Sequence, residues 1–113
     1  YVIRMVAKNR DEAEKLMQKY PDRIPVIVSR NKYSETTPEI DKHRYLVPND
    51  LTIGQLQYVI RKRLSLNSDK GLFLFVNKTI MNTNTMIISA YQSEQCKEDG
   101  FLYVVYSYEN VFG

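Results

Sequence analysis

Residues 44–51 constrain the fold of this chain more than any other stretch. They read as a short strand, and because side chains alternate across a strand, Leu46 points one way while Tyr45 and Val47 point the other. A single core covers only one of these apolar faces. Pro48 closes the strand, since proline cannot donate to a ladder and is confined to edges and strand ends. The pattern predicts an exposed edge strand, which is a template for adding an extended peptide.

A strong helix start follows this strand. Thr52 and Gln55 form a capping box, and Leu51 with Leu56 forms a hydrophobic staple, so we predict a helix over residues 52–63. Its apolar stripe has the helical period and consists of Ile53, Leu56, Val59, Ile60 and Leu64. The triplet Arg61-Lys62-Arg63 lies in the last turn, where cations complement the helix dipole. Helix-capping charge and a binding role are both compatible with that triplet.

Weaker patterns outline the remaining elements. Asn9 as N-cap with Glu12 three residues later predicts a helix over about residues 10–19, which Pro21 stops. Apolar and β-branched runs predict strands at 24–29, 72–76, 79–81 and 101–107. Between these elements we expect a long polar loop at 30–41, a tight turn at Asn77-Lys78 and a short helix from Asn84 to Tyr91.

This order of elements predicts an α+β fold in which a mixed sheet grasps one long helix. The right-handed crossover rule places the last strand beside the first, in the middle of the sheet. The first two strands are expected to pair as an antiparallel hairpin, which leaves residues 44–48 at an edge. With the central helix on one face and the N-terminal helix on the other, this edge borders two grooves. Leu46 lines one groove, and Tyr45 and Val47 line the other.

Composition bounds the class of protein. With 113 residues and 43% apolar side chains, the chain is expected to form one domain over residues 1–113. No apolar run approaches the roughly 20 residues that cross a bilayer, and no signal peptide opens the chain, so we expect a soluble, cytoplasmic protein. The lone Cys96 cannot form an internal disulfide, and neither it nor His43 has metal-site spacing. We expect no metal or other cofactor.

Charge is unevenly distributed along the chain. Residues 1–64 hold 13 Lys and Arg against 8 Asp and Glu, whereas residues 65–113 hold 3 against 5. The basic half favours acidic partners, anionic membrane or nucleic acid. The nine tyrosines and the basic triplet at 61–63 make a nucleic-acid module the main rival interpretation, although the strand aromatics do not alternate with basic residues as a stacking platform would. An enzyme is not expected, because no phosphate loop or nucleophile elbow is present.

Several stretches, taken in order, resemble a known family. They are YPDRIPVIV at 20–28, RYLVPNDLTIGQ at 44–55, IRKR at 60–63, FVN at 75–77, GFLYV at 100–104, and Ser107 with ENVFG at 109–113. Over about residues 9–113 the chain resembles the autophagy ubiquitin-like modifiers, the GABARAP and microtubule-associated protein light-chain family. It departs from the family at residues 1–8, which lack the usual aromatic and acidic pair, and at residues 86–100, which are slightly longer than in many relatives.

The resemblance implies a ubiquitin-like grasp fold with an N-terminal helical extension. It also implies coupling through a C-terminal glycine to phosphatidylethanolamine on autophagosomal membranes, and binding of cargo receptors and adaptors that carry acidic aromatic-x-x-aliphatic motifs. The implied partners include ubiquitin-like activating and conjugating enzymes and a processing cysteine protease. The lipid serves as a covalent anchor, and no nucleic acid is expected.

Carried across residue by residue, the resemblance implies two pockets beside the edge strand. The first is formed by Glu12, Leu16, Pro25, Arg44, Leu46 and Phe101, and the second by Tyr45, Val47, Pro48, Leu51, Leu56 and Val59. Arg23 and Arg63 match basic residues that meet acidic motif flanks or the conjugation enzymes, and Lys42 adds charge to the same edge. Residues 72–75 are similar to a second docking face of the family.

Gly113 matches the conjugated glycine of the family. The tail at about residues 108–113 shows no capping or turn pattern, so we expect it to hang free, as termini do unless they are tied down.

Overall fold

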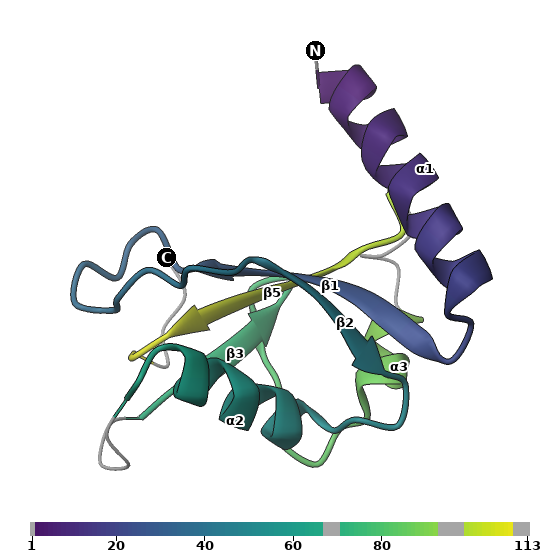
Figure 1. The fold of residues 1–113 in the computed structure, drawn as a ribbon. Helices are drawn as coiled ribbons and strands as arrows, with labels where there is room; N and C mark the ends of the chain where they lie inside the picture. Colours follow the sequence, from purple (N-terminus) through teal and green to yellow (C-terminus); the bar gives the residue numbers. More distant parts are fainter. Residues whose placement is uncertain (1, 67–70, 93–98, 110–113) are drawn as a thin grey trace.

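The structure is a computed structural model that describes residues 2–66, 71–92 and 99–109, with side chains from Asn9 onward. Its helices are α1 (Val2–Lys19), α2 (Ile53–Arg63) and α3 (Ile87–Tyr91). Its strands are β1 (Arg23–Arg30), β2 (Arg44–Pro48), β3 (Phe73–Val76), β4 (Thr79–Ile80) and β5 (Leu102–Ser107). A mixed sheet with α2 across one face and α1 at the other confirms the predicted α+β class (Figure 1).

The last strand lies in the middle of the sheet, as the crossover rule predicted. The strand order is β2-β1-β5-β3-β4, with β5 parallel to β1 and antiparallel to β3. β2 pairs with β1 as an antiparallel hairpin and stands at one edge, so the predicted edge strand is confirmed. Pro25 is accommodated because it lies opposite Leu46 and precedes the pairing of β1 with β5, which begins at Val26.

The core lies between the sheet and α2. Thr52 caps α2 by accepting a hydrogen bond from the Gln55 backbone N–H at 3.2 Å, while the Gln55 side chain accepts one from the Thr52 N–H at 2.8 Å. The predicted capping box is therefore present. It fixes the direction in which α2 leaves β2, so that its buried face packs on the sheet; the buried residues of that face are Ile53, Leu56 and Ile60.

The predicted start of the N-terminal helix is wrong. α1 begins at Val2 rather than near Asn9, and its N-terminal end extends beyond the sheet in Figure 1. Residues 2–8 contain no proline or glycine to interrupt a helix that has already formed, so the helix propagates through them. The side chain of Asn9 does not cap α1. Its amide nitrogen donates to Asp99 at 3.4 Å, and its amide oxygen accepts from Arg44 at 3.4 Å.

Smaller elements differ from expectation at their ends. The predicted turn at Asn77 and Lys78 is confirmed, since both residues have positive φ angles of 52° and 64°, as a tight hairpin turn requires. The third helix begins at Ile87 rather than Asn84, because the preceding residues form a turn. That turn is fixed by the Asn82 side chain, which accepts a hydrogen bond from the Asn84 N–H at 2.8 Å.

The tail is not free at its base. The Tyr108 N–H donates to the Thr37 hydroxyl at 2.9 Å, and the Glu109 carboxylate accepts hydrogen bonds from the loop between β1 and β2. The expectation of a loose tail is therefore wrong for these two residues, because partners far away in sequence bind them. Gly113 and Cys96 lie outside the described residues.

Candidate functional site

The outer edge of β2 offers its own backbone groups. In an antiparallel pair, residue pairs alternate between hydrogen-bonded and non-hydrogen-bonded. The Val28 N–H donates to the His43 carbonyl at 2.7 Å, and the Asn49 N–H donates to the Asp22 carbonyl at 3.0 Å. By alternation along the register, Tyr45 and Val47 bond to β1, whereas the backbone groups of Arg44 and Leu46 point outward. No other described strand pairs with this edge, so an incoming extended chain can bond to the outward groups of Arg44 and Leu46, of which the Leu46 carbonyl also accepts a long hydrogen bond from the Arg23 side chain.

One face of this edge lies against α1. Leu46 is half-buried there and stands opposite Pro25, which is buried. Phe101 is only 1% exposed, so it forms part of the floor rather than an open wall. From α1, Leu16 and Glu12 are half-buried. Leu46 and Leu16 are therefore the apolar members of the first predicted pocket that solvent reaches.

Arg44 connects the two sides of the first pocket. Its guanidinium lies 5.3 Å from the centre of the Phe101 ring and forms an ion pair with Glu12 at 2.5 Å. Both side chains of that pair are about half exposed, so the pair contributes little to stability, about 0.2–1 kcal/mol. An acidic ligand can therefore compete with Glu12 for Arg44 at small cost.

Asp99 anchors α1 to the start of β5, and sequence reasoning missed it. Its carboxylate accepts hydrogen bonds from the Asn9 side chain at 3.4 Å, from the Phe101 N–H at 3.0 Å and from the Tyr103 hydroxyl. Burial, helped by this carboxylate, raises the pKa of Tyr103 to about 12. The Asp99-Gly100 pair is a typical turn signal that could have marked the position, although its partner on α1 lies 90 positions away.

The other face of β2 belongs largely to the core. Val47 is 7% exposed and Leu56 is fully buried, so these two members of the second predicted pocket lie beneath its surface and are not open to a ligand. Tyr45 and Leu51 are half-buried against the core, whereas Val59 is 39% exposed. Pro48 is exposed as well. The accessible part of the second pocket is thus Tyr45, Pro48, Leu51 and Val59.

Basic side chains lie near both ends of β2. At its start, the Lys42 amine lies 5.0 Å from the centre of the Tyr45 ring, and Arg63 of α2 pairs with Asp41 at 2.8 Å. This arginine lowers the pKa of the Asp41 carboxyl. At the other end, Arg23 stands opposite Pro48 and donates to the Leu46 carbonyl at 3.5 Å. The edge strand therefore lies between positive charges at both ends.

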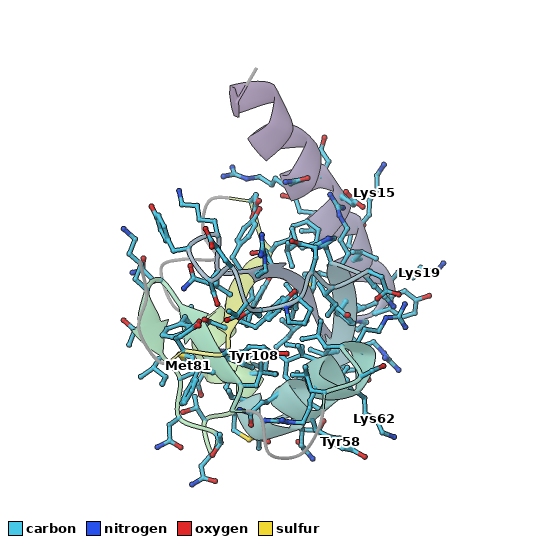
Figure 2. The ribbon with its side chains drawn as sticks, turned by 90° about the vertical axis from the view of Figure 1, so that its left-hand side faces the viewer. Lys15, Lys19, Tyr58, Lys62, Met81 and Tyr108 are labelled. Carbon is cyan, nitrogen blue, oxygen red and sulfur yellow. The ribbon has the colours of Figure 1, made fainter. Side chains whose placement is uncertain are left out.

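Other basic residues point away from this edge. Figure 2 shows Lys15 and Lys19 extending from α1, and Tyr58 and Lys62 on the outside of α2. The Lys62 amine lies 5.2 Å from the centre of the Tyr58 ring. The basic triplet at the end of α2 is thus divided, because Arg63 turns to Asp41 near β2 while Lys62 covers an exposed tyrosine.

A hollow of about 220 Å³ lies between α2, β3 and β4. It is lined by Ile53, Gln57, Leu72, Phe73, Leu74, Ile80, Met81 and Thr83. Three of the four residues of the predicted second docking face, 72–74, line it. Phe75, the fourth residue, is 2% exposed and does not line the hollow.

The described residues include no group of three His, Cys, Asp or Glu side chains arranged to hold a metal ion. None of the described helices is long and apolar enough to cross a membrane. His43 is exposed, and its Nδ1 lies 2.9 Å from the Val28 carbonyl at the end of the hairpin.

Comparison with known proteins now decides the family. A family model described as "Autophagy protein Atg8 ubiquitin like" matches residues 8–113. Autophagy-related protein 8e of Arabidopsis thaliana is 51% identical over 106 residues, which cover 94% of this chain and 85% of the relative. Autophagy-related protein 8 of Kluyveromyces lactis is 52% identical over the same share of this chain and 84% of its own length. The protein of the same name from Mycosarcoma maydis is 51% identical and 88% covered.

The chain belongs to the Atg8 family.

Membership in the Atg8 family confirms the resemblance stated above and the ubiquitin-like fold. The family match begins at residue 8, inside α1, so the first turns of α1 lie outside it, where the sequence also departed from the family pattern. The match includes the whole of β2, the capping box of α2 and the tail residues 110–113. The candidate edge is therefore part of what this chain shares with Atg8 proteins.

Proposed function

We propose that this Atg8-family chain is coupled through Gly113 to phosphatidylethanolamine and recruits receptors that carry acidic aromatic-x-x-aliphatic motifs along β2. It is itself a modifier and not an enzyme. One observation carries the binding half of the proposal: the outward backbone groups of Arg44 and Leu46 border half-buried apolar side chains on both faces of the strand. An extended peptide that bonds to this edge places alternate side chains on opposite faces.

The spacing of the motif fits this edge. Two residues separate its aromatic and aliphatic positions, so in an extended peptide these two side chains point to opposite faces. One of them then faces α1 and the other faces α2. Leu46 and Leu16 supply accessible apolar surface on the α1 side, while Tyr45, Leu51 and Val59 supply it on the α2 side. The apolar residues thereby provide affinity, and the backbone of β2 provides register.

The charge of the edge favours acidic flanks. Lys42, Arg44 and Arg63 stand near the start of β2, and Arg23 stands near its end. Positive charges on a surface speed the approach of an acidic segment and reject basic ones. Because the ion pairs of Arg44 and Arg63 are exposed, both arginines can exchange their present carboxylate for that of a ligand.

The coupling half rests on family membership and on the residue type. The Gly113 carboxylate would displace pyrophosphate from ATP, giving an acyl-adenylate. An enzyme thiol would then displace AMP to form a thioester, and the lipid amine would displace that thiol to form an amide. Glycine has no side chain to crowd these attacks. Two acyl chains then hold a cytoplasmic domain on the autophagosomal membrane far more firmly than one chain does.

A peptide-binding experiment tests the edge. We expect Leu46→Ala to weaken binding of a fluorescent acidic aromatic-x-x-aliphatic peptide about tenfold, because an accessible anchor residue is truncated. Leu46 is preferable to Tyr45, which also packs against the core. Tyr58→Ala is the control, because Tyr58 is an exposed aromatic residue on the outside of α2, away from this edge. If the folded Leu46→Ala protein bound the peptide as tightly as wild type, the assignment of the binding site to this edge would be wrong.

A coupling experiment tests the tail separately. The chain is incubated with activating and conjugating enzymes of Arabidopsis thaliana, ATP and liposomes containing phosphatidylethanolamine. We expect wild type and Leu46→Ala to form the lipidated product, and a chain lacking Gly113 to form none. A lipidated band from the deletion variant would overturn the assignment of Gly113.

A further inference from the structure

A cluster of hydroxyl groups holds the base of the tail. The Glu109 carboxylate accepts hydrogen bonds from the hydroxyls of Ser34, of Thr36 at 3.1 Å and of Ser107 at 3.0 Å. We call this group, together with Thr37, the tail clasp. Ser34, Thr37 and Ser107 are at most 5% exposed, whereas Thr36 and the Glu109 carboxylate lie at the surface. The hydrogen bonds to the carboxylate lower the pKa of Glu109.

The hydrogens in the clasp can be assigned by counting donors. The Tyr108 N–H donates to the Thr37 hydroxyl at 2.9 Å, and the Thr37 and Ser34 hydroxyl oxygens lie 2.5 Å apart. Because Ser34 uses its one hydrogen for Glu109, Thr37 must donate to Ser34. The result is a chain of donors from a backbone amide to a carboxylate. Each bond in such a chain polarises the next, which favours a single arrangement.

The loop that supplies these hydroxyls is itself fixed. Arg30 donates to the carbonyls of Ser34 at 3.2 Å and Thr37 at 3.3 Å. The Tyr106 hydroxyl donates to the Pro38 carbonyl at 2.8 Å, which fastens the loop to β5. The clasp is therefore a rigid contact with the sheet rather than a chance meeting of two loose segments.

We propose that the tail clasp is a positioning site for the chemistry at Gly113. It sets the point at which the tail leaves the domain, so that an activating enzyme bound to the domain meets the terminal glycine within a fixed range. The four residues beyond Glu109 span at most about 14 Å when extended, so the place of the clasp limits where the carboxylate can go. The proposal rests on the proposed coupling through Gly113.

Loss of the clasp should weaken productive capture of the tail. Release of residues 108 and 109 adds conformations that the tail must lose when it enters an enzyme site. The consequence is a higher KM with little change in kcat, since the clasp touches none of the reacting atoms. From the net value of one or two hydrogen bonds we expect kcat/KM to fall about fivefold.

Variants in the loop are the sharpest test, because the loop is far from the tail in sequence and acts on it only through the clasp. Thr37→Val keeps the shape of the side chain and removes both of its hydrogen bonds, whereas Thr37→Ser keeps the hydroxyl. Ser34→Ala breaks the chain one step later. Glu35→Ala is the control, because Glu35 is an exposed side chain of the same loop.

The measurements are steady-state thioester formation on the activating enzyme of Arabidopsis thaliana, and hydrogen exchange at the Tyr108 amide. Thr37→Val should raise KM about fivefold and speed exchange, while Thr37→Ser and Glu35→Ala should stay near wild type. A faster-exchanging Thr37→Val protein with an unchanged KM would overturn the proposal. Where Thr37→Val does not fold, Ser34→Ala decides in the same way. A wild-type chain that forms no thioester refutes the coupling itself, and the positioning role with it.

Discussion

Gly100 carries a prediction about how α1 is held. The residue has a φ angle of +84°, a conformation that side chains other than glycine rarely adopt, and it directly follows Asp99. A Cβ atom added to Gly100 would lie 2.9 Å from the Cβ of Ala13, which is 2% exposed on the inner side of α1. Gly100→Ala therefore strains the backbone and pushes against α1 at the same time.

The two effects have separate magnitudes. A left-handed backbone conformation costs an ordinary residue about 1–2 kcal/mol. The carbon–carbon approach is well inside the ordinary contact distance of about 3.5–4.0 Å, and overpacking costs about 1–3 kcal/mol. Because α1 packs on the sheet from one side only, it can relieve part of the clash by moving outward (Figure 1). We expect Gly100→Ala to lower the free energy of unfolding by about 2–3 kcal/mol.

Urea unfolding followed by circular dichroism measures this loss. Gly71→Ala is the control, because its added Cβ meets Phe73 at 3.4 Å, an ordinary contact. Ala13→Gly removes the atom that Gly100→Ala would strike, so the double variant separates the clash from the backbone strain. We expect a coupling of about 1 kcal/mol between the two positions. A loss below about 0.5 kcal/mol, or a coupling of zero, would refute the argument.

Three further predictions concern charge and protonation. Arg63→Glu should slow association of an acidic peptide about tenfold at low salt, and the difference should shrink as the salt concentration rises. Stopped-flow mixing measures these association rates, and an equal fall for a neutral peptide would count against electrostatic steering. Because its hydrogen bonds lower the pKa of Glu109 in the folded chain, this carboxylate stabilises the fold above pH 4.5, and that contribution is lost as the pH falls through the folded-state pKa. The free energy of unfolding of wild type should therefore exceed that of Glu109→Gln at neutral pH, and this difference should disappear in acid, as measured by urea unfolding at several pH values. Burial raises the pKa of both Tyr103 and Tyr106 to about 12, so these two phenols should ionise last in an ultraviolet titration, and Tyr106→Phe should remove one late step. The stability that these raised pKa values provide is present below pH 10 and is lost as the pH rises through about 12.

The sequence predicts best where the determining interactions are local. The capping box of Thr52 and Gln55 specifies the start of α2, because both partners lie within one helical turn. Side-chain alternation correctly separates Leu46 from Tyr45, because it depends only on the strand. The crossover rule places β5 correctly, since it depends on chirality rather than on individual side chains.

Prediction fails where a residue's partner is distant in sequence. Asn9 has the residue type and spacing of a helix cap, yet its partners are Asp99 and Arg44. Glu109 follows the last strand with no local signal, and Ser34, which holds it, lies 75 positions earlier. For the candidate pockets, the sequence selects side chains by type but cannot say which are covered. Leu56 lies beneath the surface because it is on the face of α2 that packs on the sheet, and Phe101 lies beneath the Arg44 guanidinium.

Because β5 lies in the centre of the sheet, the complete sheet can form only after most of the chain has been synthesised. The hairpins β1–β2 and β3–β4 both precede β5 in the chain, and within the described sheet only β5 joins them. A chain that is stalled or cut before Leu102 has two separate hairpins and exposes the apolar faces that would have met in the core. Such fragments are prone to aggregation and attract chaperones and proteases. Folding thus serves as a check on length: a chain that has acquired its sheet has also been translated almost to the glycine that its proposed chemistry requires.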